Sequence, residues 1–262
     1  MKYDEDYKNA EYIDGAEAYP ARWLEQSKAY VAELGARAQM NVRYGDSDRQ
    51  RFDMFQPTGV SRGTMIFVHG GYWKALDKSY TSYLAEGALA KGWAVAMPSY
   101  DLCPDVKIAD ITRQIAAAVT EVGNRTFGKL ALAGHSAGGH LVARMMDPLV
   151  LPADVRRRIE NIVSISPVAD LVPLLETTMN EVLKLDLAEA QAESPINMSP
   201  PHGVNVTIWV GADERPAFLE QSQSLSRAWG AKKIIAEGKH HFDVFDALTD
   251  PDSDIIKGLL GG

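Results

Sequence analysis

From residue 63 onward, short and almost wholly apolar runs alternate with longer segments whose apolar residues recur every three to four positions. Short apolar runs bounded by Gly, Pro or charged residues are typical of strands buried on both faces, and the longer segments predict helices. The predicted strands are 64–68, 93–98, 129–133, 159–166, 205–210 and 232–236, and the predicted helices are 79–90, 105–122, 137–146 and 216–229. This alternation predicts the α/β class, with a mostly parallel central sheet and helices on both faces.

The first 38 residues predict an N-terminal helical extension, because apolar residues recur at helical spacing over 21–36. Residues 40–44 and 51–56 predict a hairpin of two strands. Residues 169–201 interrupt the strand and helix rhythm and end in prolines, so we expect a small helical insert there, a candidate lid. No Gly/Ser-rich linker divides the chain, and we expect residues 1–262 to form one domain.

Composition narrows the function classes. The formal net charge is -8, from 27 Lys and Arg against 35 Asp and Glu, which opposes binding to nucleic acid. A single cysteine rules out an intramolecular disulfide framework and suits a reducing compartment. No apolar stretch is long enough to span a bilayer, and the start of the chain does not resemble a secretory signal. We expect a cytoplasmic protein with a small-molecule substrate, either a monomer or a homodimer.

One pattern points to a nucleophile. The sequence Gly134-His135-Ser136-Ala137-Gly138 lies between a predicted strand and a predicted helix. In a G-x-S-x-G turn the glycines permit a sharp bend that exposes a strained serine, and the following helix directs its N–H groups at the hydroxyl. The five-residue pattern alone also fits a glycine-rich turn with an incidental serine. Its place between strand and helix favours Ser136 as nucleophile.

A second glycine-rich loop, His69-Gly70-Gly71-Tyr72-Trp73, follows the strand predicted at 64–68. Such loops supply backbone N–H groups to an oxyanion, so Gly70, Gly71, Tyr72 and Ala137 are candidates for an oxyanion hole. Tyr72 and Trp73 are also candidates for an aromatic wall that binds substrate, although either aromatic side chain would equally suit core packing.

A serine nucleophile needs a base and an acid, which in this topology follow it along the chain. Asp213 and Glu214 follow one strand, and we prefer Asp213 because it is nearer the strand end, with Glu214 in reserve. His240 and His241 follow the last strand, and we choose His241 as the base. The other histidines are expected to orient loops (His69 and His135) or to be ordinary polar residues (His140 and His202).

Other chemistries fit less well. Adjacent histidines do not converge easily on one ion, and no H-E-x-x-H helix is present, so we expect no metal. No P-loop or G-x-G-x-x-G follows the relevant strands, and we expect no cofactor. Cys103 lacks a nucleophile elbow and is better explained as a packed or incidental thiol.

With these motifs in order, the chain from about residue 40 to its end resembles an α/β-hydrolase, and more narrowly the kynurenine formamidase (arylformamidase) branch. The narrower resemblance rests on 69–73, on Tyr100-Asp101-Leu102-Cys103-Pro104, on the insert over 183–195, on 213–222, and on His241-Phe242. It implies Ser136 as nucleophile, Asp213 as orienting acid and His241 as general base. The implied reaction is hydrolysis of N-formylkynurenine to kynurenine and formate through an acyl-enzyme.

Two alternatives accompany this hypothesis. A short-chain carboxylesterase or thioesterase would use similar residues, and a non-catalytic ligand-binding protein of the same fold would need none of them. If the substrate carries a carboxylate, the net charge of -8 opposes it. A local cation must then compensate, and the sequence does not identify it.

Overall fold

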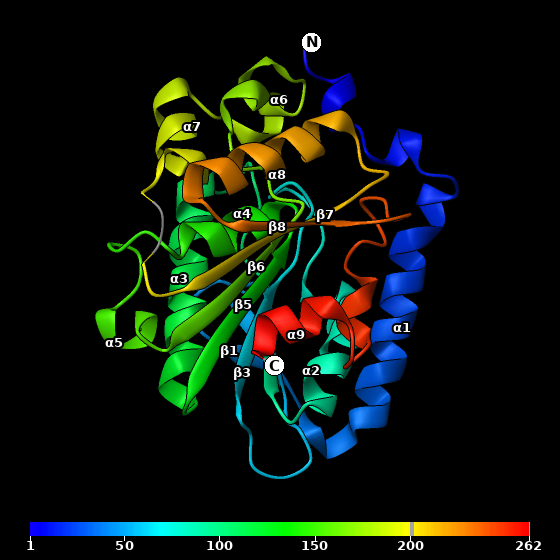
Figure 1. Ribbon diagram of the computed structural model, residues 1–262, viewed down its shortest axis with the longest axis vertical. Coiled ribbons are helices and arrows are strands. Elements are labelled where there is room, and N and C mark those ends of the chain that lie inside the picture. Colours follow the sequence, from blue (N-terminus) through cyan, green and yellow to red (C-terminus); the bar gives the residue numbers. More distant parts are fainter. Residues whose placement is uncertain (200–201, 262) are drawn as a thin grey trace.

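The computed structural model describes residues 1–199 and 202–261, which form an eight-stranded sheet between two layers of helices (Figure 1). The strands are β1 (Ala38–Arg43), β2 (Arg51–Phe55), β3 (Gly63–Val68), β4 (Ala94–Pro98), β5 (Lys129–His135), β6 (Ile159–Ile165), β7 (Asn205–Gly211) and β8 (Lys232–Ala236). Their order across the sheet is β1-β2-β4-β3-β5-β6-β7-β8. The hairpin and all six apolar runs predicted from the sequence are therefore strands, although β8 is not buried on both faces as predicted, because it lies at the edge of the sheet.

The sheet is antiparallel only at one edge. β1 pairs with β2 and β2 with β4 in antiparallel register, whereas every pair from β4 to β8 is parallel. At the centre, Ile66 of β3 lies between Ala96 of β4 and Leu132 of β5. Because the central strands run in one direction, their carboxyl ends meet at one edge, where ligands bind in sheets of this kind. The predicted α/β class with a mostly parallel sheet is confirmed.

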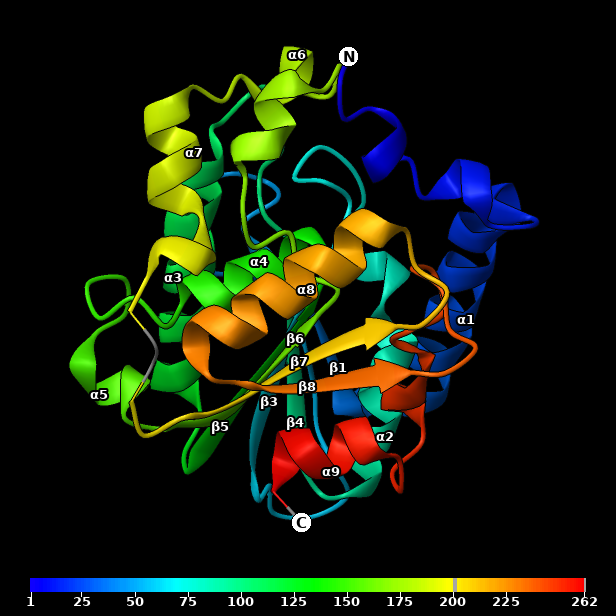
Figure 2. The same ribbon diagram turned by 45° about the horizontal axis from the view of Figure 1, so that its top comes forward.

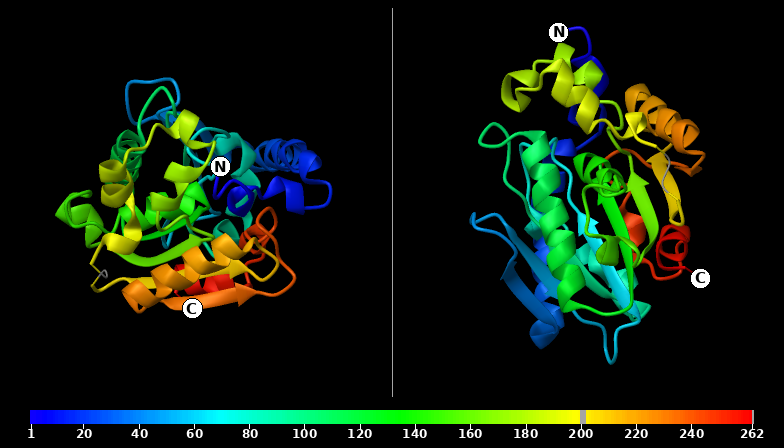
Figure 3. Two further views of the ribbon diagram at one scale, coloured as in Figure 1. Left: turned by 90° about the horizontal axis from the view of Figure 1, so that it is seen from above. Right: turned by 90° about the vertical axis from the view of Figure 1, so that its left-hand side faces the viewer.

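Successive side chains of each buried strand enter two different cores. Ile66 and Val68 join the core beneath α3 (Ile108–Arg125), α4 (Ala137–Arg144) and α8 (Pro216–Trp229). Met65 and Phe67 join the core beneath α1 (Tyr19–Leu34), α2 (Glu86–Ala90) and α9 (Asp254–Leu260). Figure 3 shows these layers on opposite faces of the sheet. This two-sided burial explains why the strands are apolar throughout rather than alternating.

Some helices differ from the prediction. The segment 79–90 forms two 3₁₀ turns (Lys78–Tyr80 and Ser82–Ala85) before the short α2, because Thr81 between them leaves the helical region at φ -127° and ψ 2°. Two helices, α5 (Ala153–Arg156) and α9, were not predicted from the sequence. In the portion of the chain described above, no helix is both long and apolar enough to cross a membrane.

Two irregular segments meet above the carboxyl ends of the strands. One contains α6 (Asn180–Leu183) and α7 (Leu187–Glu193), within the predicted insert, and its prolines at 200–201 lie outside the described residues. The other is the start of the chain, which enters through 3₁₀ turns before α1 (Figure 2). The Tyr3 N–H donates to the Glu176 carbonyl over 3.3 Å, and the Thr178 N–H donates to the Asp4 carboxylate over 2.6 Å. The chain start is thereby joined to the insert.

Candidate active site

Ser136 occupies a strained turn between β5 and α4. Its backbone has φ 56° and ψ -117°, a positive-φ conformation that a residue with a side chain adopts only when its surroundings enforce it. The serine N–H donates to the Ile165 carbonyl over 2.8 Å. A Cβ at Gly138 would overlap the carbonyl oxygen of Val68, and one at Gly134 would overlap the Gly138 carbonyl. Both glycines of G-x-S-x-G are therefore required by close backbone contact.

His241 lies in the core of the site and bonds a carboxylate. Its Nδ1 lies 2.6 Å from Glu214 Oε2, and both side chains are buried. The neighbouring His240 turns away, with its Nε2 3.0 Å from the Tyr19 hydroxyl of α1. Ser136 and His241 line the same cavity. The sequence-based choice of His241 over His240 agrees with this placement.

The acidic partner of His241 is Glu214, and the prediction of Asp213 is wrong. Asp213 is exposed, and its backbone N–H donates to the Lys239 carbonyl over 2.9 Å. β7 ends at Gly211, and the turn that follows directs the residue at 214, not the one at 213, back toward the end of the strand. Asp213 was preferred because it is nearer in sequence to the end of β7, and the turn makes that criterion wrong.

One carboxylate oxygen of Glu214 accepts hydrogen bonds from neighbouring groups, and the other faces His241. Its Oε1 accepts hydrogen bonds from the Gly211 N–H at 3.0 Å and from the Ser166 hydroxyl. Ser166, with φ 47°, directly follows β6 and was not singled out from the sequence. Its position just beyond the carboxyl end of a central strand is the signal that would have identified it. The carboxylate thus has a fixed orientation toward His241.

The loop after β3 has the backbone shape expected of an oxyanion hole. Gly71, Tyr72 and Trp73 have φ 103°, 49° and 56° in succession. Across 1–199 and 202–261, the backbone N–H groups of Gly70, Gly71, Tyr72 and Ala137 donate to no protein acceptor. Successive unengaged N–H groups in a left-handed turn form a concave site for an anion. All four residues predicted for the oxyanion hole therefore have a free backbone N–H group that could donate to an oxyanion.

His69 and Tyr100 support this loop from below. Their rings stack with centroids 4.3 Å apart, and the Tyr100 hydroxyl lies 3.1 Å from the His69 carbonyl and 3.2 Å from the Gly70 carbonyl. Tyr100 is fully buried. The Tyr100 to Pro104 segment, a family signature in the sequence, thus has a structural role beside the site. The expected orienting role of His69 fits these contacts.

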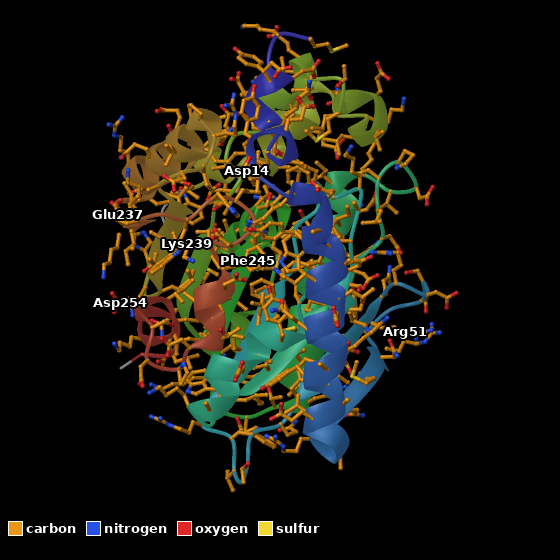
Figure 4. All side chains as sticks on the ribbon, turned by 90° about the vertical axis from the view of Figure 1, so that its right-hand side faces the viewer. Asp14, Arg51, Glu237, Lys239, Phe245 and Asp254 are labelled. Carbon is orange, nitrogen blue, oxygen red and sulfur yellow. The ribbon has the colours of Figure 1, made fainter. Side chains whose placement is uncertain are left out.

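A cavity of about 390 Å³ opens beside Ser136. That volume is typical of small-molecule sites. Aromatic and aliphatic side chains dominate its lining, among them Tyr72, Trp23, Phe67, Phe242 and Phe245. Figure 4 marks Phe245 on the side of the sheet that α1 covers. The cavity is therefore suited to an apolar or aromatic group next to the serine.

Tyr72 lines this cavity, but Trp73 does not, which corrects its expected role in binding substrate. Trp73 is fully buried in the core beneath the loop, edge-on to His140 with ring centroids 5.0 Å apart. The two successive positive φ values at Tyr72 and Trp73 send these adjacent side chains to different environments. Core packing, the alternative considered for both aromatics, applies to Trp73.

The N-terminal segment Tyr7–Glu11 forms one wall of the cavity. The Tyr72 hydroxyl donates to the Tyr7 carbonyl over 2.7 Å and accepts from Asn9 Nδ2 over 3.2 Å. Gln221 Nε2 donates to the Tyr7 hydroxyl over 2.9 Å. Of the insert, none of the residues up to 199 lines the cavity. The chain start therefore covers the cavity where the insert was expected to, and its polar composition gave no sign of this role.

Burial sets the protonation of the groups around the serine. Desolvation lowers the pKa of His69 to about 4 and that of His135 well below its usual range, so both rings are neutral near pH 7. Burial raises the pKa of the Cys103 thiol to about 11, which keeps it protonated and unreactive. Among the side chains the structure describes, no group of three or more His, Cys, Asp or Glu could hold a metal ion.

Comparison with known proteins places this geometry in a family. A family model described as alpha/beta hydrolase fold matches residues 65–199, just over half of the 262 residues. The chain belongs to the alpha/beta hydrolase fold family. That match spans the glycine-rich loop, the serine turn and much of the insert, and confirms the fold inferred from the sequence.

Within this family the chain is a distant homologue of kynurenine formamidases over most of its length. It is 28% identical over 242 residues to the kynurenine formamidase of Salmo salar, covering 86% of this chain and 82% of the relative. It is 29% identical over 240 residues to that of Drosophila melanogaster, covering 84% and 79%. The resemblance stated from the motifs is confirmed at this level.

Among solved structures, one relative has a higher sequence identity to this chain but is described as a different kind of enzyme. A crystal structure of a proposed thioesterase from Silicibacter sp. TM1040 is 53% identical, with a TM-score of 0.98 and 100% coverage of both chains. Esterase B from Lactobacillus Rhamnosis is 18% identical with a TM-score of 0.65, covering 93% of this chain and 92% of its own, and shares the fold. Fold alone does not specify the substrate.

Proposed function

We propose that this alpha/beta hydrolase cleaves a small acyl group by an acyl-enzyme mechanism, and that its substrate is an N-formyl arylamide of the N-formylkynurenine type. The observation that carries the proposal is the buried His241–Glu214 pair in a cavity shared with the strained Ser136 and the glycine-rich loop. These are the base, orienting acid, nucleophile and oxyanion donors that serine hydrolases combine.

In the proposed reaction, His241 Nε2 accepts the Ser136 proton while Oγ attacks the formyl carbon. The resulting oxyanion accepts hydrogen bonds from the N–H groups of Gly71, Tyr72 and Ala137. As the C–N bond breaks, His241 returns the proton to the aryl amine, which leaves. Water then attacks the formyl-serine by the same route, releasing formate and restoring the free serine. Glu214 accepts the Nδ1–H throughout and so stabilises the imidazolium.

The aryl formamide assignment is supported by the cavity and by the curated relatives. Ser136 and the glycine-rich loop line one cavity, where a formyl group, the smallest acyl group, would lie against the serine, and the aromatic lining suits the aryl leaving group. An aryl amine is also a better leaving group than an alkyl amine. Both relatives named above as kynurenine formamidases align over more than three quarters of their own length.

A short-chain thioesterase or carboxylesterase is the second candidate, favoured by the 53% identical crystal structure described as a proposed thioesterase. Initial rates of the purified protein on N-formylkynurenine, formanilide, p-nitrophenyl acetate and acetyl-CoA separate the candidates. We expect kcat/KM to be highest for N-formylkynurenine and to disappear in Ser136→Ala. A negligible formamidase rate beside rapid ester or thioester hydrolysis would reject the formamidase. Failure of a fluorophosphonate probe to label Ser136 would favour a non-catalytic binding protein.

A further inference from the structure

β8 forms one edge of the sheet. It is last in the strand order that the structure describes, and in that order its neighbour is β7. Figure 3, seen from above, shows β8 at the margin of the molecule. A strand at the end of a sheet presents a row of backbone N–H and C=O groups that can pair with another chain. This edge is therefore a candidate surface for association.

The pairing with β7 determines which backbone groups of β8 face outward. The Ala236 carbonyl accepts from the Ala212 N–H over 2.9 Å, so Ala236 directs its backbone groups toward β7. In a parallel pair, every second residue of a strand directs both its N–H and its C=O to the same neighbour. Lys233 and Ile235 therefore direct theirs away from β7. β8 can thus offer a regular set of donors and acceptors to a further strand.

The side chains along this edge combine an apolar residue with both signs of charge. Ile235 is 44% exposed. Two residues before it, Lys233 donates a hydrogen bond to the neutral amide of Gln223 on α8, so its charge is not paired by that contact. Two residues after it, Glu237 is exposed, and Figure 4 marks it at the periphery. A cation and an anion placed symmetrically about an isoleucine are complementary to a second copy of the same strand.

Two copies of β8 can pair in antiparallel orientation about a two-fold axis. In such an interface the same residues of both copies meet, so the position of the axis sets every pair. With the axis at Ile235, the two isoleucines face each other and Lys233 of each copy lies opposite Glu237 of the other. With the axis at Lys233, two lysines would meet, and with the axis at Ile234, Lys233 would face Ile235. Since opposite charges stabilise a cross-strand pair and like charges destabilise it, the register centred on Ile235 is favoured.

The other edge strand, β1, lacks these properties. Its pairing with β2 shifts register between Gln39 and Val42, and Asn41 has φ 59°. Irregularities of this kind protect an edge strand from pairing with another chain. A lysine on an edge strand has the same effect where like charges meet. In β8, Glu237 supplies the opposite charge, so Lys233 favours pairing in the one register described above.

We propose that the protein forms a homodimer in solution through antiparallel pairing of β8 with β8 of a second copy. Backbone hydrogen bonds between the two copies of Ile235 join the sheets, the isoleucine side chains lie at the centre, and two Lys233–Glu237 pairs fix the register. None of residues 232–237 lines the cavity beside Ser136. The dimer is therefore independent of the substrate proposed above.

Sedimentation velocity of charge variants tests the register. We expect the wild type to be dimeric at micromolar concentration. Lys233→Glu and Glu237→Lys should each raise the dimer Kd at least about tenfold, because like charges then meet twice in the interface. The double variant Lys233→Glu/Glu237→Lys exchanges the charges and should restore the wild-type Kd. Lys232→Glu is the matched control, since it makes the same change one residue away, opposite Gly238, and should leave the dimer intact.

A cysteine at the axis tests the same register chemically. In the proposed pairing the two Cα atoms at position 235 lie about 5.5 Å apart, within the range of a disulfide. Ile235→Cys should therefore form a disulfide-linked dimer on mild oxidation, and the one native cysteine, Cys103, is buried. Lys232→Cys is the control, because its two copies would lie about 20 Å apart along the strands and should remain unlinked.

A wild type that stays monomeric throughout the micromolar range would overturn the proposal. A dimer whose Kd is the same in Lys233→Glu and Glu237→Lys, and which Ile235→Cys does not cross-link, would use another surface and would equally overturn it. Circular dichroism confirms that each variant folds. Either result leaves the proposed formamidase unaffected, because substrate hydrolysis is measured separately at the cavity.

Discussion

His241 Nδ1 lies 2.6 Å from Glu214 Oε2, and the side chains of both residues are almost completely buried. The second carboxylate oxygen of Glu214 is occupied by the Gly211 N–H and the Ser166 hydroxyl, so the acid cannot rotate away without losing those bonds. A carboxylate beside Nδ1 favours the neutral tautomer that carries its proton on Nδ1. That tautomer is the one a general base needs.

Replacing Glu214 by Gln therefore tests the acid. The amide keeps the shape of the side chain but removes the charge that stabilises an imidazolium and selects the tautomer. We expect Glu214→Gln to lower kcat by roughly three to four orders of magnitude, as in other triads. The rate of p-nitrophenyl acetate hydrolysis measures the effect, and circular dichroism confirms that the variant folds.

Asp213→Asn is the matched control, because it makes the same chemical change one residue away. Asp213 is exposed, and the carboxylate that bonds His241 is Glu214, so we expect kcat within about twofold of wild type. A large loss in Asp213→Asn with little change in Glu214→Gln would contradict the assignment of Glu214.

The apolar runs predicted the centre of the sheet because β3, β4, β5 and β6 are buried on both faces. The serine turn was also predictable, since Gly134 and Gly138 are required by backbone contact. The choice between Asp213 and Glu214 could not be predicted, because the geometry of a short turn decides which of two adjacent carboxylates faces inward. For the same reason the sequence could not separate Tyr72, in the cavity wall, from Trp73, in the core.

The role of residues 7–11 at the cavity could not be predicted from the sequence either. Residues 7–11 form part of the cavity wall, yet they are polar and lack a periodic pattern. Their position depends on single long-range bonds, such as the one from the Tyr72 hydroxyl to the Tyr7 carbonyl. Such tertiary contacts between residues 65 positions apart leave no local signature in a sequence.

Buried histidines should make the protein less stable in mild acid. Burial lowers the pKa of His69 and His140 to about 4, below their ordinary value of 6.5. Between these values the unfolded chain binds protons that the folded chain does not, so the free energy of unfolding decreases as pH falls. Each histidine should contribute a loss of about 1.5 kcal/mol between pH about 6.5 and about 5.

Urea unfolding at several pH values in that window measures the loss, and His140→Gln isolates one histidine. Glutamine retains a donor for the Glu193 carbonyl, which lies 2.7 Å from His140 Nε2, but does not titrate. We expect the variant to lose less stability than wild type over the same interval. Identical pH dependence in the two proteins would show that His140 does not contribute.

Two glycine substitutions should have opposite effects on stability. A Cβ at Gly138 would overlap the backbone oxygen of Val68, so we expect Gly138→Ala to lower the free energy of unfolding by at least about 3 kcal/mol and to abolish activity. Gly258 lies in α9, where an added methyl group would meet no atom within 4 Å, and Gly258→Ala should raise stability by about 0.5–1 kcal/mol. Denaturant unfolding compares both with wild type, and equal effects would contradict this contrast.

The Tyr72 hydroxyl should control how firmly the chain start covers the cavity. Tyr72→Phe removes two hydrogen bonds, the one donated to the Tyr7 carbonyl and the one accepted from Asn9, but retains the ring beside Phe218. Since a net hydrogen bond contributes about 1 kcal/mol, we expect amides of residues 7–11 to exchange with solvent at least about tenfold faster. Hydrogen exchange with mass spectrometry measures this opening. Tyr30→Phe is the control, since the half-buried Tyr30 hydroxyl makes no hydrogen bond within residues 1–199 and 202–261. Unchanged exchange over residues 7–11 in Tyr72→Phe would mean that the packing of Tyr7 against Phe218 holds the segment without this hydroxyl.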